Sequence, residues 1–232
     1  MLKNYQFIDL THTLDENIPV WPNSQRFGRN ITKDYAQSGY RVEHYNFAAG
    51  TGTHMDAPSH FAKGGYTISD FQLSELIVPA CVLDIAKQVS ENSDYIITAD
   101  DLLTWEKQHD SIPAGSLFLA YTGWAKYWPD EQKYRNQDKN GEQHFPGFGK
   151  TAAELLIERN IVGIGIDTLS LDPGMDKTFA THFTMLPNNK YQLENLTNLD
   201  QLPATGATIF VMPVKIKNAP EAPARVIAIL NR

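Results

Sequence analysis

The sequence contains almost no cysteine and no long apolar segment. Cys81 is the single cysteine among 232 residues, so no internal disulfide forms, and its place in the apolar run 77–83 predicts a small buried side chain. Asp9 interrupts the first ten residues too early for a secretory signal, and no segment supplies the roughly 20 apolar residues of a membrane span. We therefore expect a cytoplasmic protein that makes no membrane contact.

Runs of basic residues are also missing. Lys and Arg number 20 against 27 Asp and Glu, and the resulting net charge of -7 is scattered along the chain. Nothing resembles the basic patch that neutralises a nucleic-acid backbone, so nucleic acid is not an expected partner. The hydrophobic fraction of 42% suits a chain with a sizeable core, and the length fits one domain covering 1–232.

Local patterns predict an α/β fold with a mixed β-sheet and flanking helices. Segments rich in β-branched and apolar residues predict strands at 7–10, 40–48, 77–85, 116–122, 161–167, 208–216 and 224–230. Apolar residues at helical spacing predict helices at 99–109 and 151–160. Residues 126–148 carry aromatic residues among polar residues, Gly and Pro, which predicts a long irregular loop that is either a lid, a dimer contact or a surface segment.

The most informative cluster is His54, Asp56 and His60, which follow a predicted strand and stand beside two glycines and a proline. Residues two apart in an extended chain project to the same face, so His54 and Asp56 can reach one cation together. Pro58 can supply the turn that brings His60 back to the site. Imidazole and carboxylate ligands suit zinc, manganese or iron.

Two or three ligands do not complete a metal site, and a second pair offers candidates. His182 lies in Thr-Phe-Ala-Thr-His-Phe-Thr, and Glu194 follows 12 positions later. Spacing alone makes this pair a weak signal, because an isolated His or Glu is more often structural than a ligand.

These motifs resemble a known family. The run 52–60, Gly-Thr-His-Met-Asp-Ala-Pro-Ser-His, is similar to the HxGTHxDxPxH signature of the cyclase-like metal hydrolases, which include bacterial kynurenine formamidase and isatin hydrolase. The segments 8–12 and 19–22 resemble the opening strand of that family and its proline-aromatic-proline segment, and 163–170 with Asp172 resembles a later strand. His182 and Glu194 resemble its distal ligand pair. The resemblance covers nearly the whole chain and is specific for the superfamily, not for a substrate.

The resemblance implies a swivelling β/β/α-type fold, as in kynurenine formamidase, assembled as a homodimer or higher homo-oligomer with one or two divalent metal ions. Carried over by position, His54 and Asp56 would be proximal ligands, and Asp56 would be able to bridge two metals. His182 and Glu194 would hold the distal metal, and His60 would be the catalytic acid/base.

Gly50 departs from the signature, because it stands where the family has its first histidine and offers no ligand. Three outcomes stay open: one shared metal, water in the empty position, or a replacement ligand. His44 and His12 are the nearby sequence candidates for a replacement, although both are more often structural. We favour one zinc or manganese ion held by some of His54, Asp56, His182 and Glu194.

The implied chemistry is hydrolysis of an amide-type carbon-nitrogen bond in a small-molecule substrate. A divalent ion lowers the pKa of water from about 15.7 towards roughly 7 and polarises a carbonyl. His60 would take the proton and return it to the leaving nitrogen. An arylformamide such as N-formylkynurenine is placed slightly ahead of an isatin-like lactam, and Trp21 and Phe148 are expected to contact a planar substrate.

Two other functions compete with this prediction. One is a lactonase or cyclase-type enzyme, and the other is a non-catalytic protein that binds a metal or a small molecule on the same fold. A binding protein has no need for an acid/base beside its ligands, so His60 favours catalysis.

Overall fold

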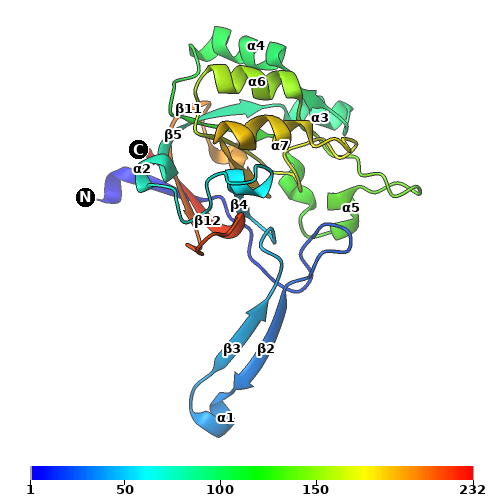
Figure 1. Cartoon of the computed structure of the whole chain (residues 1–232), viewed down its shortest axis with the longest axis vertical. Coiled ribbons are helices and arrows are strands. Elements are labelled where there is room, and N and C mark those ends of the chain that lie inside the picture. The colour runs from blue at the N-terminus through cyan, green and yellow to red at the C-terminus, as the bar shows by residue number, and fades with distance from the viewer. Residues whose placement is uncertain (1, 232) are drawn as a thin grey trace.

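A closed β-sheet forms the centre of the protein in a computed structural model that describes residues 2–231 (Figure 1). The strand order is β1-β12-β11-β5-β7-β9-β10-β4, and β4 also pairs with β12, so the sheet closes on itself with β1 added outside. The strands of this sheet are β1 (Tyr5–Asp9), β4 (His54–Asp56), β5 (Ile77–Asp84), β7 (Leu117–Tyr121), β9 (Gly163–Ile166), β10 (Tyr191–Glu194), β11 (Thr205–Pro213) and β12 (Glu221–Asn231). Parallel and antiparallel pairs occur together, which confirms the predicted mixed sheet.

Strand β5 shows how the sequence separates two cores. Its side chains alternate, and Val78, Ala80 and Val82 join one buried cluster while Cys81 and Leu83 join another. Strand β7 does the same with Leu117 and Leu119 against Phe118 and Ala120. One cluster therefore fills the closed sheet, and the other lies between the sheet and its helices. Cys81 is buried as predicted.

Helices pack on the outer side of the sheet (Figure 1). They are α2 (Leu73–Leu76), α3 (Ala86–Glu91), α4 (Ala99–His109), α5 (Glu131–Arg135), α6 (Lys150–Glu158) and α7 (Ala180–Met185), whereas α1 (Tyr35–Ser38) lies apart from the sheet. Helix α4 begins with a capping box between Thr98 and Asp101, and buries Leu102 and Trp105. The predictions at 99–109 and 151–160 are thereby confirmed. No helix within residues 2–231 has the length and apolarity needed to cross a membrane.

All seven predicted strands are present, whereas five observed strands lack the expected pattern, among them β2 (Gly28–Lys33), in which Ile31 is the single apolar side chain. Strands β6 (Ile96–Ile97) and β8 (Gly147–Phe148) are only two residues long and pair with each other. Strand β4 consists of ligand-type residues around Met55, and β10 begins only after a 3-10 turn. Hydrophobic alternation is too short in each of them to give a signal.

Residues 126–148 are more ordered than the predicted irregular loop. The segment contains α5 and β8, and Tyr134, Phe145 and Phe148 are completely buried in the outer core. Trp124, just before it, donates from Nε1 to the carbonyl oxygen of Tyr134 at 2.8 Å. The aromatic residues that suggested a surface role therefore anchor the segment, because each finds a partner inside the core. The segment is thus an irregular stretch interrupted by α5 and β8.

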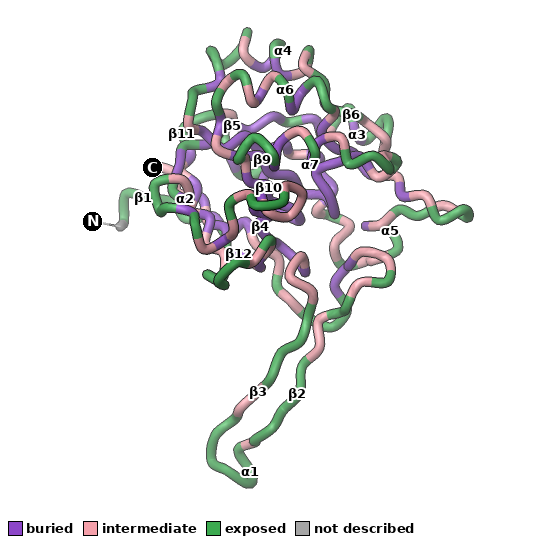
Figure 2. Tube along the Cα trace, viewed as in Figure 1, coloured by how far each residue is buried: buried purple, intermediate pink, exposed green. Residues whose placement is uncertain are grey.

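A two-stranded arm projects from the body of the molecule (Figure 1). Strands β2 (Gly28–Lys33) and β3 (Val42–Asn46) form it, with α1 at its tip. Figure 2 shows the arm exposed over most of its length. Its large exposed side chains include Ile31, Tyr35, Tyr40 and Tyr45. An isolated hairpin of this kind is marginally stable in water, so the arm is a feature that requires explanation.

Candidate active site

Strand β4 places the predicted ligands between two neighbouring strands. His54 lies opposite Glu194 on β10, and Asp56 lies opposite Glu221 on β12. Directly opposed residues share one face of a sheet, and so do residues two apart along a strand. His54, Asp56, Glu194 and Glu221 therefore project from the same face. Helix α7 contributes His182 to this group.

The four predicted metal ligands form a compact ring. Nε2 of His54 lies 3.4 Å from Oδ1 of Asp56 and 3.3 Å from Oε2 of Glu194. Nε2 of His182 lies 3.5 Å from Oδ2 of Asp56 and 3.4 Å from Oε1 of Glu194. Ligands bound at 2.0–2.1 Å in a tetrahedral shell are separated by about 3.3–3.4 Å. The ring thus matches the spacing of a metal coordination shell.

Hydrogen bonds fix the orientation of both imidazoles. Nδ1 of His54 lies 2.8 Å from the carbonyl oxygen of Gly52, and Nδ1 of His182 is hydrogen-bonded to Oδ2 of Asp172. A carbonyl accepts only from a protonated nitrogen, so in neutral His54 the free lone pair is on Nε2 and faces the ring. Asp172 also accepts from the backbone N–H of Thr181 at 2.6 Å, which ties the carboxylate to the start of α7.

We expect Asp172→Asn to weaken metal binding by about ten- to a hundredfold, because the amide holds the His182 imidazole in the wrong orientation or tautomer. Titration of the metal-free protein with Mn²⁺ measures this. Asp176→Asn is a suitable control, since Asp176 also accepts hydrogen bonds at the start of α7 but does not bond to the His182 ring. Unchanged affinity in the Asp172 variant would remove the orienting role.

The charges in the ring are strongly coupled. Burial by itself would lower the pKa of His54 and His182, but the neighbouring carboxylates outweigh burial and raise both pKa values well above the ordinary range. Burial likewise opposes ionisation of Asp56 and Glu194, yet the adjacent histidines lower the pKa of both carboxyl groups. Both carboxylates are therefore ionised at neutral pH, as metal ligands are.

One buried oxygen atom of Asp56 indicates whether the ring is suited to a bound cation. Oδ1 of Asp56 is inaccessible to solvent and accepts no hydrogen bond from the described part of the chain. Its nearest charged neighbour is Nε2 of His54 at 3.4 Å, so no hydrogen bond offsets its burial, and a bound cation would supply the missing contact. Among residues 2–231, two sets of three ligand atoms lie within 4.8 Å of one another: Asp56, His60 and His182, and His54, Asp56 and Glu221. Both sets share Asp56, so the residues present fit a divalent metal.

The ring opens into a cavity of about 420 Å³, within the usual range for small-molecule sites. His60 lies at its edge with 29% of its side chain exposed, and its Nδ1 is 3.7 Å from Oε2 of Glu221. Trp21, predicted as a substrate contact, lines this cavity. Phe61 and Phe179 line it as well and had no sequence signal beyond the position of Phe61 next to His60.

Aromatic side chains of the cavity pack against the ring of four predicted metal ligands. The ring centroid of Phe61 is 4.7 Å from that of His182 and 5.7 Å from that of Phe179. Phe179 has a φ of 52°, a left-handed conformation that is unfavourable for a bulky residue and often marks a functional position. The cavity therefore offers flat apolar surfaces beside a charged cluster, an arrangement suited to a planar substrate with a polar reactive group.

Three predicted or considered residues lie elsewhere. Phe148 is completely buried against Phe118 in the outer core and does not line the cavity, because β8 directs it towards the helices. The expectation that Phe148 contacts substrate is therefore corrected. His44 is exposed on the arm, and His12 stacks on Trp128 at 4.0 Å, so neither stands in for the missing histidine at position 50.

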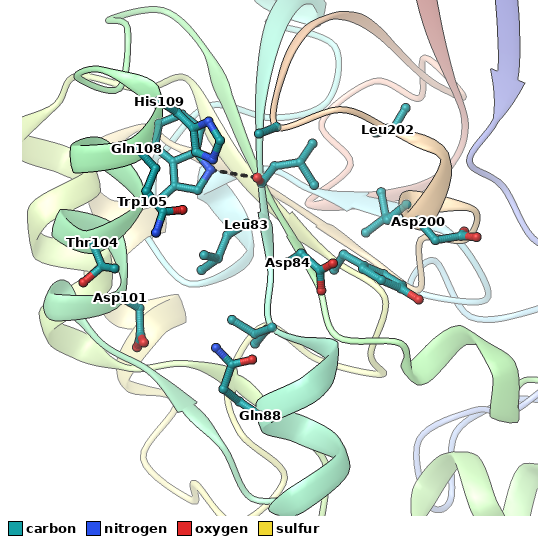
Figure 3. Close-up of a pocket in the computed structure, with 15 residues that line it drawn as sticks. Leu83, Asp84, Gln88, Asp101, Thr104, Trp105, Gln108, His109, Asp200 and Leu202 are labelled. Atoms are coloured by element: carbon teal, nitrogen blue, oxygen red, sulfur yellow. Dashed lines mark hydrogen bonds between the residues drawn. The ribbon is translucent and has the colours of Figure 1, made fainter.

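A second cavity of about 380 Å³ lies beside α4 (Figure 3). Its labelled residues include Asp101, Trp105, His109 and Asp200, and Nε1 of Trp105 donates to the carbonyl oxygen of Val82 at 2.8 Å. Neither of the ligand sets found among residues 2–231 includes a residue from this cavity.

The fold and the ring together define a metal-dependent hydrolase. A family model described as "Putative cyclase" matches residues 8–173. The isatin hydrolase of Roseibium aggregatum is 31% identical over 98% of this chain and 92% of its own length, and the kynurenine formamidase of Bacillus thuringiensis is 25% identical over 97% and 98%. The chain belongs to the cyclase family.

Solved structures agree with this assignment. Isatin hydrolase A from Ralstonia solanacearum matches with a TM-score of 0.93 and 34% identity over 99% of this chain and 93% of its own. An isatin hydrolase bound to the product analogue thioisatinate matches with a TM-score of 0.94 and 29% identity over 99% and 94%. The predicted cyclase-like fold and the predicted enzyme class, a metal-dependent hydrolase of amide-type bonds, are confirmed.

Proposed function

We propose that this enzyme opens the lactam of a planar, aromatic-fused substrate resembling isatin. The observation that carries the proposal is the likeness to isatin hydrolases over 99% of the chain, including the complex with a product analogue. The aromatic wall formed by Trp21, Phe61 and Phe179 supports it, because it offers flat surfaces beside the ring. This proposal reverses the sequence-based order, which placed an arylformamide first.

We further propose that His54, Asp56, His182 and Glu194 hold the divalent ion, either manganese or zinc. When bound, the ion activates water and polarises the substrate carbonyl. The chain supplies two anionic and two imidazole ligands from three separate elements, and Asp172 and the Gly52 carbonyl keep the imidazoles in place.

His60 is the proposed acid/base. The side chain of His60 is 29% exposed at the cavity. The side chains of the four ring residues are only 2–5% exposed. In lactam opening the water oxygen forms a bond to the carbonyl carbon while the carbon-nitrogen bond breaks. His60 accepts one water proton and returns it to the leaving nitrogen, which gives an arylamine, and the second water proton is released to solvent as the new carboxylic acid ionises to a carboxylate. The side chains of Phe61 and Phe179 limit the access of water to the part of the cavity beside His60.

The substrate proposal is tested by measuring kcat/KM of the Mn²⁺-loaded enzyme for isatin, N-formylkynurenine and an aromatic-fused lactone. We expect isatin to give the highest value. A higher value for N-formylkynurenine would replace the proposal by an arylformamidase, and a higher value for the lactone by a lactonase. Absence of turnover on all three would favour a different amide.

We also propose that the enzyme is a cytoplasmic homodimer in which the arm contacts a second copy of the chain. The arm exposes Tyr35 and Tyr45 by 66% and 58%, although Arg41 lies over the ring of Tyr35 and Phe27 stacks on Tyr45. Strand β3 ends at Asn46, and Ala48 and Ala49, a few residues further along the chain, line the ring cavity, so a partner held by the arm would sit near the site. Apolar side chains on an otherwise unsupported hairpin favour burial in an assembly.

Replacing residues 29–45 by a short Gly-Ser linker is expected to convert the dimer to a monomer, because the arm supplies the proposed contact. Light scattering after size-exclusion chromatography measures the mass. As a control, Leu103→Ser changes an exposed apolar residue on α4 and should leave the mass unchanged. A wild-type protein that is already monomeric at micromolar concentration would contradict the assembly.

A further inference from the structure

Glu221 occupies the space that a side chain at position 50 would fill. A Cβ placed on Gly50 would lie 2.5 Å from Oε1 of Glu221 and 3.2 Å from Nε2 of His54. The first distance is shorter than real Cβ contacts allow. The family signature has a histidine at this position, and in this chain the carboxylate of Glu221 is found there instead.

The backbone does not explain why position 50 is glycine. Gly52, two residues later, has a φ of 69°, which favours glycine, but Gly50 is not among the residues with positive φ. Any L-amino acid can adopt its conformation. A side chain at position 50 would therefore require the flexible carboxylate end of Glu221 to move aside, and the two positions are coupled in this way.

The placement of Glu221 follows from the sheet. Strand β12 pairs with β4 so that Glu221 is directly opposite Asp56, on the face that carries the ring. Its carboxylate belongs to one of the two compact ligand sets, with His54 and Asp56, and it lines the ring cavity. Pro220 and Pro223 flank this stretch and limit its backbone freedom.

We propose that Glu221 is the metal ligand that replaces the missing histidine at position 50, completing a set with His54 and Asp56. The inference rests on the proposed metal site. Exchange of an imidazole for a carboxylate adds an oxygen donor and a negative charge, and such donors suit manganese better than imidazole does. The exchange therefore raises the affinity for Mn²⁺ relative to Zn²⁺ compared with a site that carries histidine at position 50.

Metal affinity of the metal-free protein, measured by titration with Mn²⁺ and Zn²⁺, tests the proposal without reference to any substrate. Glu221→Gln keeps the size of the side chain but removes its charge, and is expected to weaken Mn²⁺ binding about a hundredfold or more, because a direct ligand matters at least as much as the outer-shell partners whose loss costs about ten- to a hundredfold. Glu154→Gln removes a charge from the exposed side of α6 and serves as the control, with wild-type affinity expected. Far-UV circular dichroism checks the fold of each variant.

A rescue experiment separates ligation from a general effect of charge. Gly50→His alone should bind Mn²⁺ poorly, because its side chain meets Glu221. The double variant Gly50→His/Glu221→Ala should recover affinity to within about tenfold of wild type, and its affinity ratio should shift towards Zn²⁺. Recovery by a neutral imidazole cannot come from charge alone. In cobalt-loaded protein, the visible absorption band should change in Glu221→Gln and not in Glu154→Gln.

Two results would overturn the inference. One is Mn²⁺ affinity in Glu221→Gln within about threefold of wild type, which would leave Glu221 as a partner of His60 only. The other is a double variant that binds no better than Gly50→His. A wild-type protein that binds Mn²⁺ but hydrolyses no amide would overturn the proposed function and leave the assignment of Glu221 intact.

Discussion

Asp56→Asn is expected to abolish tight metal binding and to reduce hydrolysis by about a thousandfold or more. Asp56 contacts both imidazoles of the ring and belongs to both compact ligand sets. A catalytic metal contributes several kcal/mol of transition-state stabilisation, and each 1.36 kcal/mol corresponds to a factor of ten in rate. The amide is the same size as the carboxylate but carries no charge, so the ring loses an anionic ligand that the other residues cannot replace.

Metal content of the purified variant and its kcat/KM for isatin measure the two effects together. Asp200→Asn is the matched control, because Asp200 is an exposed aspartate beside the second cavity and should retain wild-type metal and activity (Figure 3). A variant at Asp56 that keeps a full complement of metal would show that the ring is not the metal site.

His60→Asn is expected to retain metal and to lower kcat by a factor of about a hundred to ten thousand, the usual contribution of a general acid/base. His60 differs from the ring histidines because its side chain is partly exposed and its Nδ1 faces Glu221. Loss of the proton carrier therefore affects turnover while the ring remains intact.

The measurement is kcat of the Mn²⁺-loaded variant together with its metal content. His109→Asn, which changes an exposed histidine at the end of α4, controls for the substitution itself. If His60→Asn lost its metal, His60 would be a ligand within the set it forms with Asp56 and His182, and the acid/base would have to be sought elsewhere.

The sequence predicted the local part of this site well. His54, Asp56 and His60 lie within one short run, and their alternation along a strand was sufficient to place the first two on one face. The pairing of His182 and Glu194 with them was available only through the family resemblance, because β10 and α7 reach β4 through the closure of the sheet. No spacing rule relates residues that far apart along the chain.

The sequence did not indicate Glu221 as a candidate ligand, for the same reason. It stands in the last strand, 165 positions after Asp56, and becomes its neighbour only through the pairing of β12 with β4. The glycine at position 50 marks a missing ligand, and the sequence offers only His12 and His44 as nearby histidines outside the predicted site. The observed candidate is a distant carboxylate that uses the space the glycine leaves.

For the aromatic residues, the sequence did not distinguish core positions from pocket positions. Trp21 and Phe148 were both candidate pocket residues, with Trp21 favoured, although large apolar side chains serve cores as well as binding sites. Burial separates them: Trp21 lines the cavity, whereas Phe148 packs on Phe118. Composition also suggested that 126–148 was irregular, although its aromatic residues anchor short elements in the outer core.

Hydrolysis of isatin before and after removal of metal is the most direct test of the account. Protein dialysed against a chelator should lose its activity, and addition of Mn²⁺ should restore it in proportion to the metal bound, without a change in far-UV circular dichroism. Undiminished hydrolysis by protein shown to be free of metal would contradict the central claim that the ring around Asp56 works through a bound divalent ion.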